Sequence, residues 1–177
     1  MIRAYDAIQT ARALLGTPYC EMDCIRLIVM VIRRSSGGRP DYRCEGTNWL
    51  WRSADNAGKY RHLTWRQHGT QGAKAGMLAF KQDGADVHHV GLVTECGTVI
   101  HSSSVKGRVV ETALDDTWRL LAMHRDIQCE EAESSLTEVP EDAYTETREQ
   151  TQAFTSLVRE EDGASILLAG RWRMAND

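Results

Sequence analysis

The chain has 177 residues, which is enough for one domain of ordinary size plus an extension. Hydrophobic residues make up 42% and charged residues 26%, no apolar run is long enough to cross a bilayer, and a net charge of −4 gives no general reason to expect nucleic-acid binding. The five cysteines are an odd number and cannot all pair, so they favour free thiols in a reducing compartment over a disulfide scaffold.

Two helices are predicted in the N-terminal part of the chain. Apolar residues recur at helical spacing over 5–15, and Gly16 and Pro18 then prevent the helix from continuing. Residues 23–34 are apolar on most sides, which is typical of a buried central helix. A stretch rich in Ser, Gly and Pro over 35–40 separates this helix from the next segment.

The middle of the chain changes from helices to strands. A third helix is predicted over 47–57 with Thr47 or Asn48 as its N-cap, and residues 58–74 are predicted to be irregular. Helices followed by a meander of strands predict an α+β fold, in which an antiparallel sheet packs on the central helix. Turn residues and short apolar runs place the strands at 76–80, 88–94, 98–102, 108–111 and 120–126, with a glycine-containing hairpin turn at 95–97.

The composition changes again after Cys129. We expect residues 1–129 to form the folded domain, because 130–152 is rich in Glu, Asp, Ser and Thr and is typical of a solvated, acidic linker. Residues 153–177 regain apolar character and could belong to a second small module. The first residues lack a basic segment followed by an apolar core, so a protein that acts outside the cell would need release or delivery by another route.

Cys24 is the first candidate functional residue. Asp is a favourable N-cap, so Asp23 is expected to cap the second helix and to leave Cys24 at its first position. The helix dipole and the free amides there favour an anion, so we expect the thiol to ionise more easily than usual and to act as a nucleophile. The alternative is that Cys24 is a small buried hydrophobic residue.

Two histidines could complete a catalytic group. His89 begins one predicted strand and His101 ends the next, so the hairpin between them should bring the two rings within about 5 Å. One imidazole would then act as a base, and the other would hold its tautomer. His88 should lie on the opposite face of the strand, because adjacent strand residues alternate.

A zinc site is the alternative use of these residues. Two cysteines and two histidines are ligands of the kinds that zinc prefers. The adjacency of the histidines argues against it, because neighbouring strand residues point to opposite faces and seldom bind one ion. The four candidate ligands are Cys20, Cys24, His88 and His89.

Several motifs together resemble those of the NlpC-type cysteine peptidases, over about residues 5–125. Residues 23–27 read Asp-Cys-Ile-Arg-Leu where the family has a D-C-S-G-hydrophobic motif, and 16–19 read Gly-Thr-Pro-Tyr where it has G-x-P-Y. Residues 89–92 read His-Val-Gly-Leu, as in the family's H-V-G-hydrophobic motif. Residues 100–102, Ile-His-Ser, and 76–80, Gly-Met-Leu-Ala-Phe, match its I-H-A and G-D-L-hydrophobic-F strands, the latter without the Asp.

The resemblance implies a papain-like fold and a peptidase that cuts stem peptides of bacterial peptidoglycan, often between D-glutamate and a diamino acid. By this resemblance Cys24 is the nucleophile, His89 the general base and acid, and His101 the orienting residue. Tyr19 would support the nucleophile or the oxyanion. The implied chemistry needs no cofactor and no metal, and a phage or prophage lysis enzyme would fit it. The candidates for the substrate cleft are Ile25, Arg26 and His88.

The departures from the family pattern keep two other functions open. The usual Ser-Gly after the nucleophile is replaced by Ile25 and Arg26, which would suit a catalytically altered cell-wall-binding domain. Cys20 lies four residues before Cys24, where it could form a regulatory disulfide or serve a redox or zinc protein. The reactivity of the thiol discriminates between these hypotheses.

Overall fold

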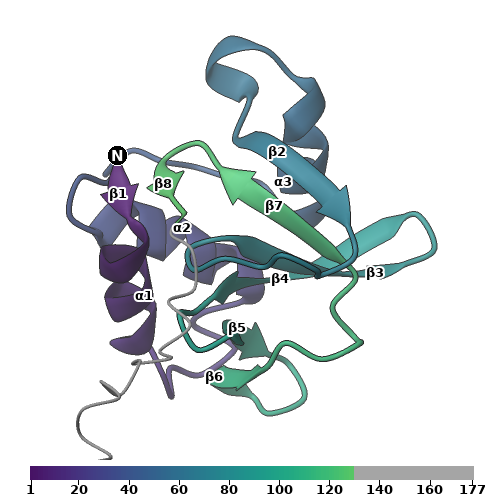
Figure 1. Ribbon diagram of the computed structural model, residues 1–177. Helices are drawn as coiled ribbons and strands as arrows, with labels where there is room; N and C mark the ends of the chain where they lie inside the picture. The colour runs from purple at the N-terminus through teal and green to yellow at the C-terminus, as the bar shows by residue number, and fades with distance from the viewer. Residues whose placement is uncertain (130–177) are drawn as a thin grey trace, which may run out of the picture. The chain divides into compact units, whose positions relative to one another are not determined.

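The structure is a computed structural model that describes residues 1–129 (Figure 1). The predicted acidic linker at 130–152 and the predicted segment at 153–177 lie outside the described residues. None of the helices within 1–129 is long and apolar enough to cross a bilayer.

The helices follow the predicted order with changed ends. The first, α1 (Ala4–Arg12), is shorter than predicted, and Gly16, with a φ of 85°, lies beyond it in the following turn. The second, α2 (Cys24–Arg34), begins as predicted, with Asp23 as its N-cap. The third, α3 (Thr47–Arg52), is followed by two 3-10 turns, η1 (Ser53–Asp55) and η2 (Gly58–Tyr60).

The predicted N-cap of the third helix is wrong. Gly46 is the N-cap of α3, and Thr47 and Asn48 both lie within the helix. Tertiary contacts use both side chains instead, because Thr47 is buried against Cys24 and the Asn48 side-chain oxygen accepts a hydrogen bond from the Val87 amide at 2.9 Å. Asn48 therefore ties α3 to the strand that carries the two neighbouring histidines.

The strands form one six-stranded antiparallel sheet in the order β2-β7-β3-β4-β5-β6, which confirms the α+β prediction. A separate pair of short parallel strands, β1 (Ile2–Arg3) and β8 (Ile127–Gln128), joins the two ends of the described chain. The sheet strands are β2 (Leu63–His68), β3 (Leu78–Asp83), β4 (Asp86–Val93), β5 (Thr98–Ser103), β6 (Arg108–Ala113) and β7 (Leu120–His124).

Strand β2 corrects the prediction that 58–74 is irregular. Only Leu63 of this strand is buried, so the alternation that marks a half-buried strand is too weak to read from the sequence. The strand lies at the edge of the sheet and pairs only with β7, so its register is set by a partner almost sixty residues away.

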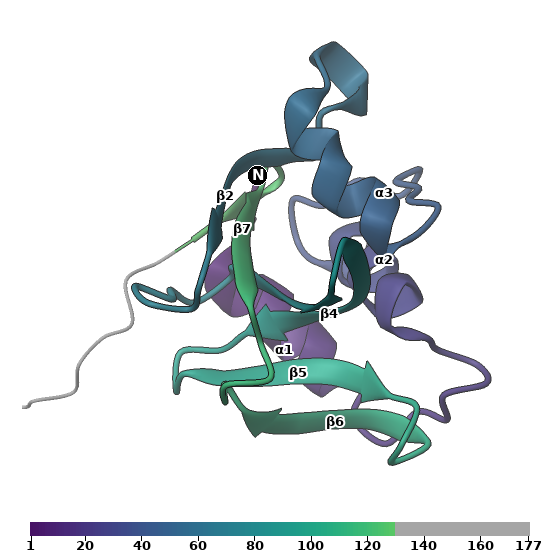
Figure 2. The same cartoon turned by 90° about the vertical axis from the view of Figure 1, so that its right-hand side faces the viewer.

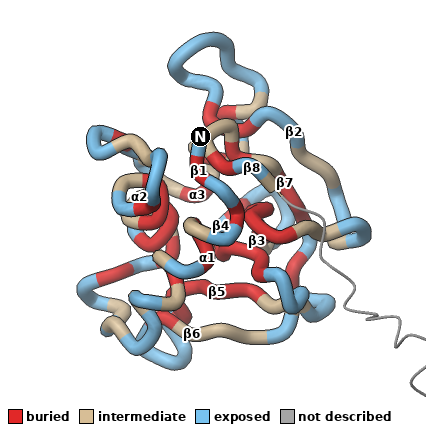
Figure 3. Tube along the Cα trace, turned by 60° about the vertical axis from the view of Figure 1, so that its left-hand side comes forward, coloured by how far each residue is buried: buried red, intermediate tan, exposed pale blue. Residues whose placement is uncertain are grey.

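The two faces of the sheet carry separate apolar clusters. Figure 2 shows the helices beside the strands β4, β5 and β6, and Figure 3 colours much of β5 and part of α2 as buried. Helix α2 packs against β4, α1 and β5, and its inward residues, such as Leu27, Ile28 and Val31, are fully buried. Each such side chain contributes about 1.5–3 kcal/mol of burial free energy. The prediction that α2 is buried nearly all round is too broad, because Ile25 and Val29 are only partly covered. The second cluster, on the other face, is built around Trp118.

His124 is almost fully buried beside Tyr42. The Asp126 amide donates to its Nδ1 at 3.2 Å, so Nε2 carries the proton and donates to the Tyr42 hydroxyl at 3.0 Å. Burial, and next the positive charge that nearby His62 and Arg39 can carry, hold the pKa of His124 well below its usual value.

Acidification below about pH 6.5 is therefore expected to destabilise the protein, because the unfolded chain takes up a proton at His124 that the folded protein does not. A histidine that stays neutral only in the folded state lowers the free energy of unfolding by about 2 kcal/mol between pH 7 and pH 5. Urea unfolding across that range measures the effect. His124→Gln should weaken the pH dependence of the free energy of unfolding. Equal slopes for wild type and His124→Gln would contradict the assignment.

Candidate active site

Cys24 is held at the start of α2 by hydrogen bonds on both sides. The Asp23 carboxylate accepts from the Arg26 amide at 2.8 Å, which confirms the predicted cap. The preceding loop runs along β6, where Gly16 donates to the Val109 carbonyl at 2.9 Å and Tyr19 donates to the Gly107 carbonyl at 2.8 Å. The Ser102 hydroxyl of β5 also donates to the carbonyl of Met22, so the loop that delivers Cys24 is fixed to the sheet.

The surroundings of the thiol do not favour its ionisation. The Cys24 Sγ lies 3.7 Å from the Thr47 hydroxyl, and the amides of Val90 and Ile25 also hydrogen-bond to it. These bonds lower the pKa of Cys24, but burial of the thiol raises it by more, so the pKa lies above its ordinary value. The prediction that the helix start makes the thiol ionise more easily is wrong for this reason.

The structure brings His89 and His101 together, as the predicted hairpin requires. His89 Nε2 and His101 Nδ1 are 2.8 Å apart, and the two rings meet edge to face. The pairing of Leu92 with Ile100 places Gly91 opposite His101. A Cβ at Gly91 would lie 2.4 Å from the Val99 side chain and 3.0 Å from the His101 Cβ, so glycine is what allows β5 to approach this closely.

Thr112 extends the histidine pair into a chain of three side chains. The Thr112 hydroxyl of β6 is 3.1 Å from His101 Nε2. If His101 Nε2 donates to Thr112, then His101 Nδ1 accepts from His89 Nε2, and His89 Nδ1 is left unprotonated. Sequence reasoning missed Thr112. The register of β5 on β6 identifies it, because His101 pairs with Val110 and Thr112 is two residues further on the same face.

Trp118 supports both rings from the other side. Its ring centroid lies 5.6 Å from that of His89 and 5.2 Å from that of His101. Lys81 covers the indole at 4.7 Å and bonds the Thr117 hydroxyl at 2.7 Å. Sequence reasoning also missed Trp118, which belongs to the loop between β6 and β7.

Both histidines are neutral in the resting site. Burial lowers the pKa of His89 to about 3, with further contributions from His101 and Lys81. Burial likewise lowers the pKa of His101 to about 4, with Lys81 next in importance. Since the pKa of Cys24 is raised, the site at neutral pH holds a thiol and two neutral imidazoles rather than a thiolate–imidazolium pair.

Cys24 is linked to the strand that carries His89 by a backbone hydrogen bond, not by a bond between the two side chains. Val90, whose amide bonds the thiol, directly follows His89 in β4. Among residues 1–129, no hydrogen bond joins the Cys24 thiol to the His89 ring, and His89 Nδ1 has no hydrogen-bond partner. His89 Nδ1 is therefore available to accept a hydrogen bond.

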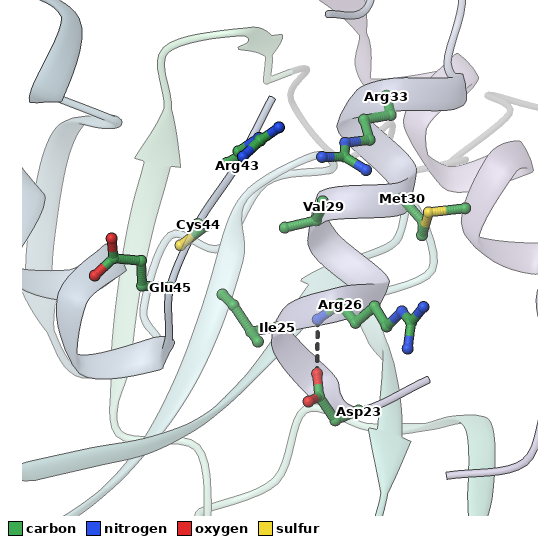
Figure 4. A pocket seen from close by; sticks show the side chains of 9 residues that line it. All are labelled: Asp23, Ile25, Arg26, Val29, Met30, Arg33, Arg43, Cys44 and Glu45. Atoms are coloured by element: carbon green, nitrogen blue, oxygen red, sulfur yellow. Dashed lines mark hydrogen bonds between the residues drawn. The ribbon is translucent and has the colours of Figure 1, made fainter. Parts of the chain in front are cut away.

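The other predicted site residues lie around this group with different exposure. Tyr19 is half-buried, and burial followed by the nearby charges of Cys24 and Asp23 raises its pKa; its hydroxyl makes no hydrogen bond within the described chain. Ile25 is partly buried, whereas Arg26 is exposed, and both line a cavity of about 570 Å³ (Figure 4). His88 is exposed.

The alternative uses of the cysteines find no support in the arrangement. Cys20 is exposed and Cys24 is buried, and both are free thiols, so the proposed regulatory disulfide is not formed. Within residues 1–129, no group of three or more His, Cys, Asp or Glu side chains is arranged to hold a metal ion, so the four zinc candidates are not assembled into a site.

The raised pKa of Cys24 predicts slow alkylation of the free protein at neutral pH. Because the thiolate is the reactive form, the rate with iodoacetamide should climb by about tenfold per pH unit between pH 7 and pH 9. Peptide mapping by mass spectrometry measures the alkylation of Cys24 separately from that of the exposed Cys20. Thr47→Val should slow the reaction further, because the hydroxyl lowers the pKa of Cys24. A rate that is already maximal at pH 7 would show an ionised thiol instead.

No family model and no curated protein sequence matches the chain. Among solved structures, it is similar to the NlpC/p60 domain of the peptidoglycan hydrolase SagA, with 18% sequence identity and a TM-score of 0.44 over 67% of this chain and 97% of that one. It is also similar to the peptidoglycan hydrolase RipB from Mycobacterium tuberculosis, with 16% identity and a TM-score of 0.47 over 67% of this chain and 63% of that one. Both TM-scores are below 0.5, so the function is inferred from this chain's own residues.

Proposed function

We propose that the chain is a cysteine peptidase that hydrolyses stem peptides of bacterial peptidoglycan, with Cys24 as nucleophile, His89 as base and His101 as the orienting residue. The observation that carries the proposal is the hydrogen-bonded chain from Thr112 through His101 to His89. This arrangement leaves His89 Nδ1 without a hydrogen-bond partner among residues 1–129. The amide of the next residue in β4, Val90, hydrogen-bonds to the Cys24 thiol. The substrate class comes from the motifs that resemble those of the NlpC-type peptidases.

The reaction begins with a thiol and a neutral base. As Cys24 Sγ attacks the carbonyl carbon of the peptide, its proton passes to His89 Nδ1. The resulting imidazolium is stabilised by the hydrogen bond that His89 Nε2 donates to His101 Nδ1. The carbonyl oxygen gains negative charge in the tetrahedral intermediate. We assign the donors to this oxygen as the Cys24 amide, which lies in the first turn of α2, and the Tyr19 hydroxyl.

The intermediate collapses by breaking the carbon–nitrogen bond. His89 returns the proton to the departing amine, which leaves a thioester on Cys24. A water molecule then gives a proton to His89 and attacks the thioester. The carbon–sulfur bond breaks, the acid product leaves, and the proton returns to the Cys24 sulfur.

Thr112→Val should lower kcat by about tenfold with little change in KM, because it removes the partner that fixes the His101 ring but touches no substrate. Valine has nearly the same shape as threonine, so a loss of packing is not the cause. Thr112→Ser keeps the hydroxyl and should restore most of the rate. Equal rates for the valine and serine variants would show that the hydrogen bond between Thr112 and His101 has no role in catalysis.

Digestion of purified peptidoglycan tests the proposal directly. The enzyme should release peptide fragments whose masses identify the cleaved bond, and Cys24→Ala should release none. The second candidate, a catalytically altered binding domain, is favoured by Ile25 and Arg26 after the nucleophile. It predicts co-sedimentation with peptidoglycan and no fragments from the wild-type protein.

A further inference from the structure

A cavity opens along the outer side of α2, immediately beyond the candidate nucleophile. It has a volume of about 570 Å³ and is bounded on one side by α2 and on the other by the segment 43–45 (Figure 4). We call it the α2 pocket. Ile25, Val29 and Cys44 give it an apolar wall that is only partly covered by the rest of the protein. Pockets of this size hold small ligands or several residues of a peptide.

Two arginines lie at the far end of the α2 pocket. Figure 4 shows the side chains of Arg33 and Arg43 approaching each other across it. The Arg33 Nε donates to the Tyr42 carbonyl at 2.7 Å, which holds that guanidinium in place and leaves its two terminal nitrogens without a hydrogen-bond partner among residues 1–129. Arg43 makes no hydrogen bond or ion pair within the same residues. This end of the pocket therefore presents unneutralised donors to a ligand.

Within residues 1–129, neither of the two acidic residues of the pocket forms an ion pair with Arg33 or Arg43. Asp23 already accepts the Arg26 amide as the cap of α2. The Glu45 carboxylate points away from Ile25 and from the apolar wall in Figure 4. A planar carboxylate matches the paired donors of a guanidinium, and such charge-assisted bonds are about twice as strong as neutral ones.

The spacing relates the arginines to the candidate nucleophile. Arg33 lies nine positions after Cys24 in α2, which is about 13.5 Å at about 1.5 Å per residue. An extended peptide covers that distance in about four residues at about 3.3–3.6 Å each. We propose that the α2 pocket binds a carboxylate of the peptide substrate about four residues from the bond that Cys24 attacks, with the intervening side chains on the apolar wall. The link to the attacked bond rests on the proposed function, whereas the carboxylate site itself does not.

Calorimetry on the Cys24→Ala protein tests the site without turnover. The probes are two N-acetylated six-residue alanine-rich peptides, each with one lysine, identical except for a free C-terminal carboxylate or a carboxamide. The carboxylate peptide should bind at least about tenfold more tightly. Arg43→Gln should abolish that difference, whereas Arg34→Gln, which removes the same charge from an exposed position on α2 outside the pocket, should preserve it.

Each outcome separates the pocket from the catalytic proposal. Equal affinity for the two peptides, or an equal loss in Arg43→Gln and Arg34→Gln, would overturn the carboxylate site. Competition by millimolar inorganic phosphate as strong as that by the peptide would also overturn it, because phosphate lacks the part that contacts the apolar wall. If the pocket prefers the carboxylate but wild type releases no peptidoglycan fragments, the site stands and the proposed function fails. If fragments are released and the peptides bind equally, only the pocket proposal fails.

Discussion

Cys24→Ala is expected to give a folded protein that releases no peptide fragments from peptidoglycan. The substitution removes the sulfur that would attack the peptide carbonyl, so the rate should fall by at least about 10³-fold. Little packing is lost, because alanine fills most of the site and a thiol forms only weak hydrogen bonds, here with the Thr47 hydroxyl at 3.7 Å and with the amides of Val90 and Ile25. The free energy of unfolding should therefore change by no more than about 1 kcal/mol. Fragment release is measured by mass spectrometry and stability by urea unfolding.

Cys20→Ala is the matched control for this result. Cys20 is an exposed free thiol four residues before the candidate nucleophile, and its loss should leave the rate in reducing buffer unchanged. Under oxidising conditions the variant should keep more activity than wild type if Cys20 can trap Cys24 as a disulfide. Wild-type turnover by Cys24→Ala would end the nucleophile assignment. Loss of activity in a folded Cys20→Ala protein would point to redox chemistry.

The features that could be predicted from the sequence depend on near neighbours in the chain. Asp23 caps α2 through an amide only three residues away, so a local preference for Asp is sufficient to place Cys24 at the helix start. The histidine pair could be predicted because a short turn at Gly97 joins the two strands that carry it. The same is true of the α+β order, which follows from the change in apolar period along the chain.

The features that could not be predicted are set by contacts between distant segments. Thr112 joins the site only because β6 pairs with β5 in one particular register. Burial of Cys24 decides the direction of its pKa shift, and no local pattern indicates that Thr47 contacts the thiol rather than capping the helix. The sequence also does not show that Ile25 and Val29 are only partly buried. The apolar residues of α2 are similar in type, and only the tertiary structure shows which of them the neighbouring segments cover.

The neutral resting state gives the proposed mechanism a specific requirement. The thiol is buried, and the pKa values of His89 and His101 are about 3 and about 4. A thiolate–imidazolium pair is therefore not formed in the free protein at neutral pH. Proton transfer must instead accompany the attack, when charge on the substrate oxygen and the imidazolium develop together. The precise placement of the His89 ring then matters more than its basicity. Substitutions of the histidines therefore test the site more sharply than changes of pH.

His89→Ala should lower the rate of fragment release by about as much as Cys24→Ala, because members of a catalytic group act as a unit. His88→Ala is the matched control, because His88 is adjacent in sequence but exposed. The register of β3 on β4 shifts at this point, so His88 has no paired residue on β3. It should change the rate by no more than about twofold. Each variant must first show the circular dichroism and unfolding midpoint of a folded protein.

Substitution of His101 separates orientation from proton transfer. His101→Asn and His101→Gln keep a side chain that can accept from His89 Nε2, so they should leave measurable activity, whereas His101→Ala should leave less. The rates are compared at pH 7, where both histidines of the wild type are neutral. If His88→Ala is as damaging as His89→Ala, the assignment of the base is wrong. If neither substitution lowers the rate, the hairpin has no catalytic role, and binding without turnover becomes the function to test at this site.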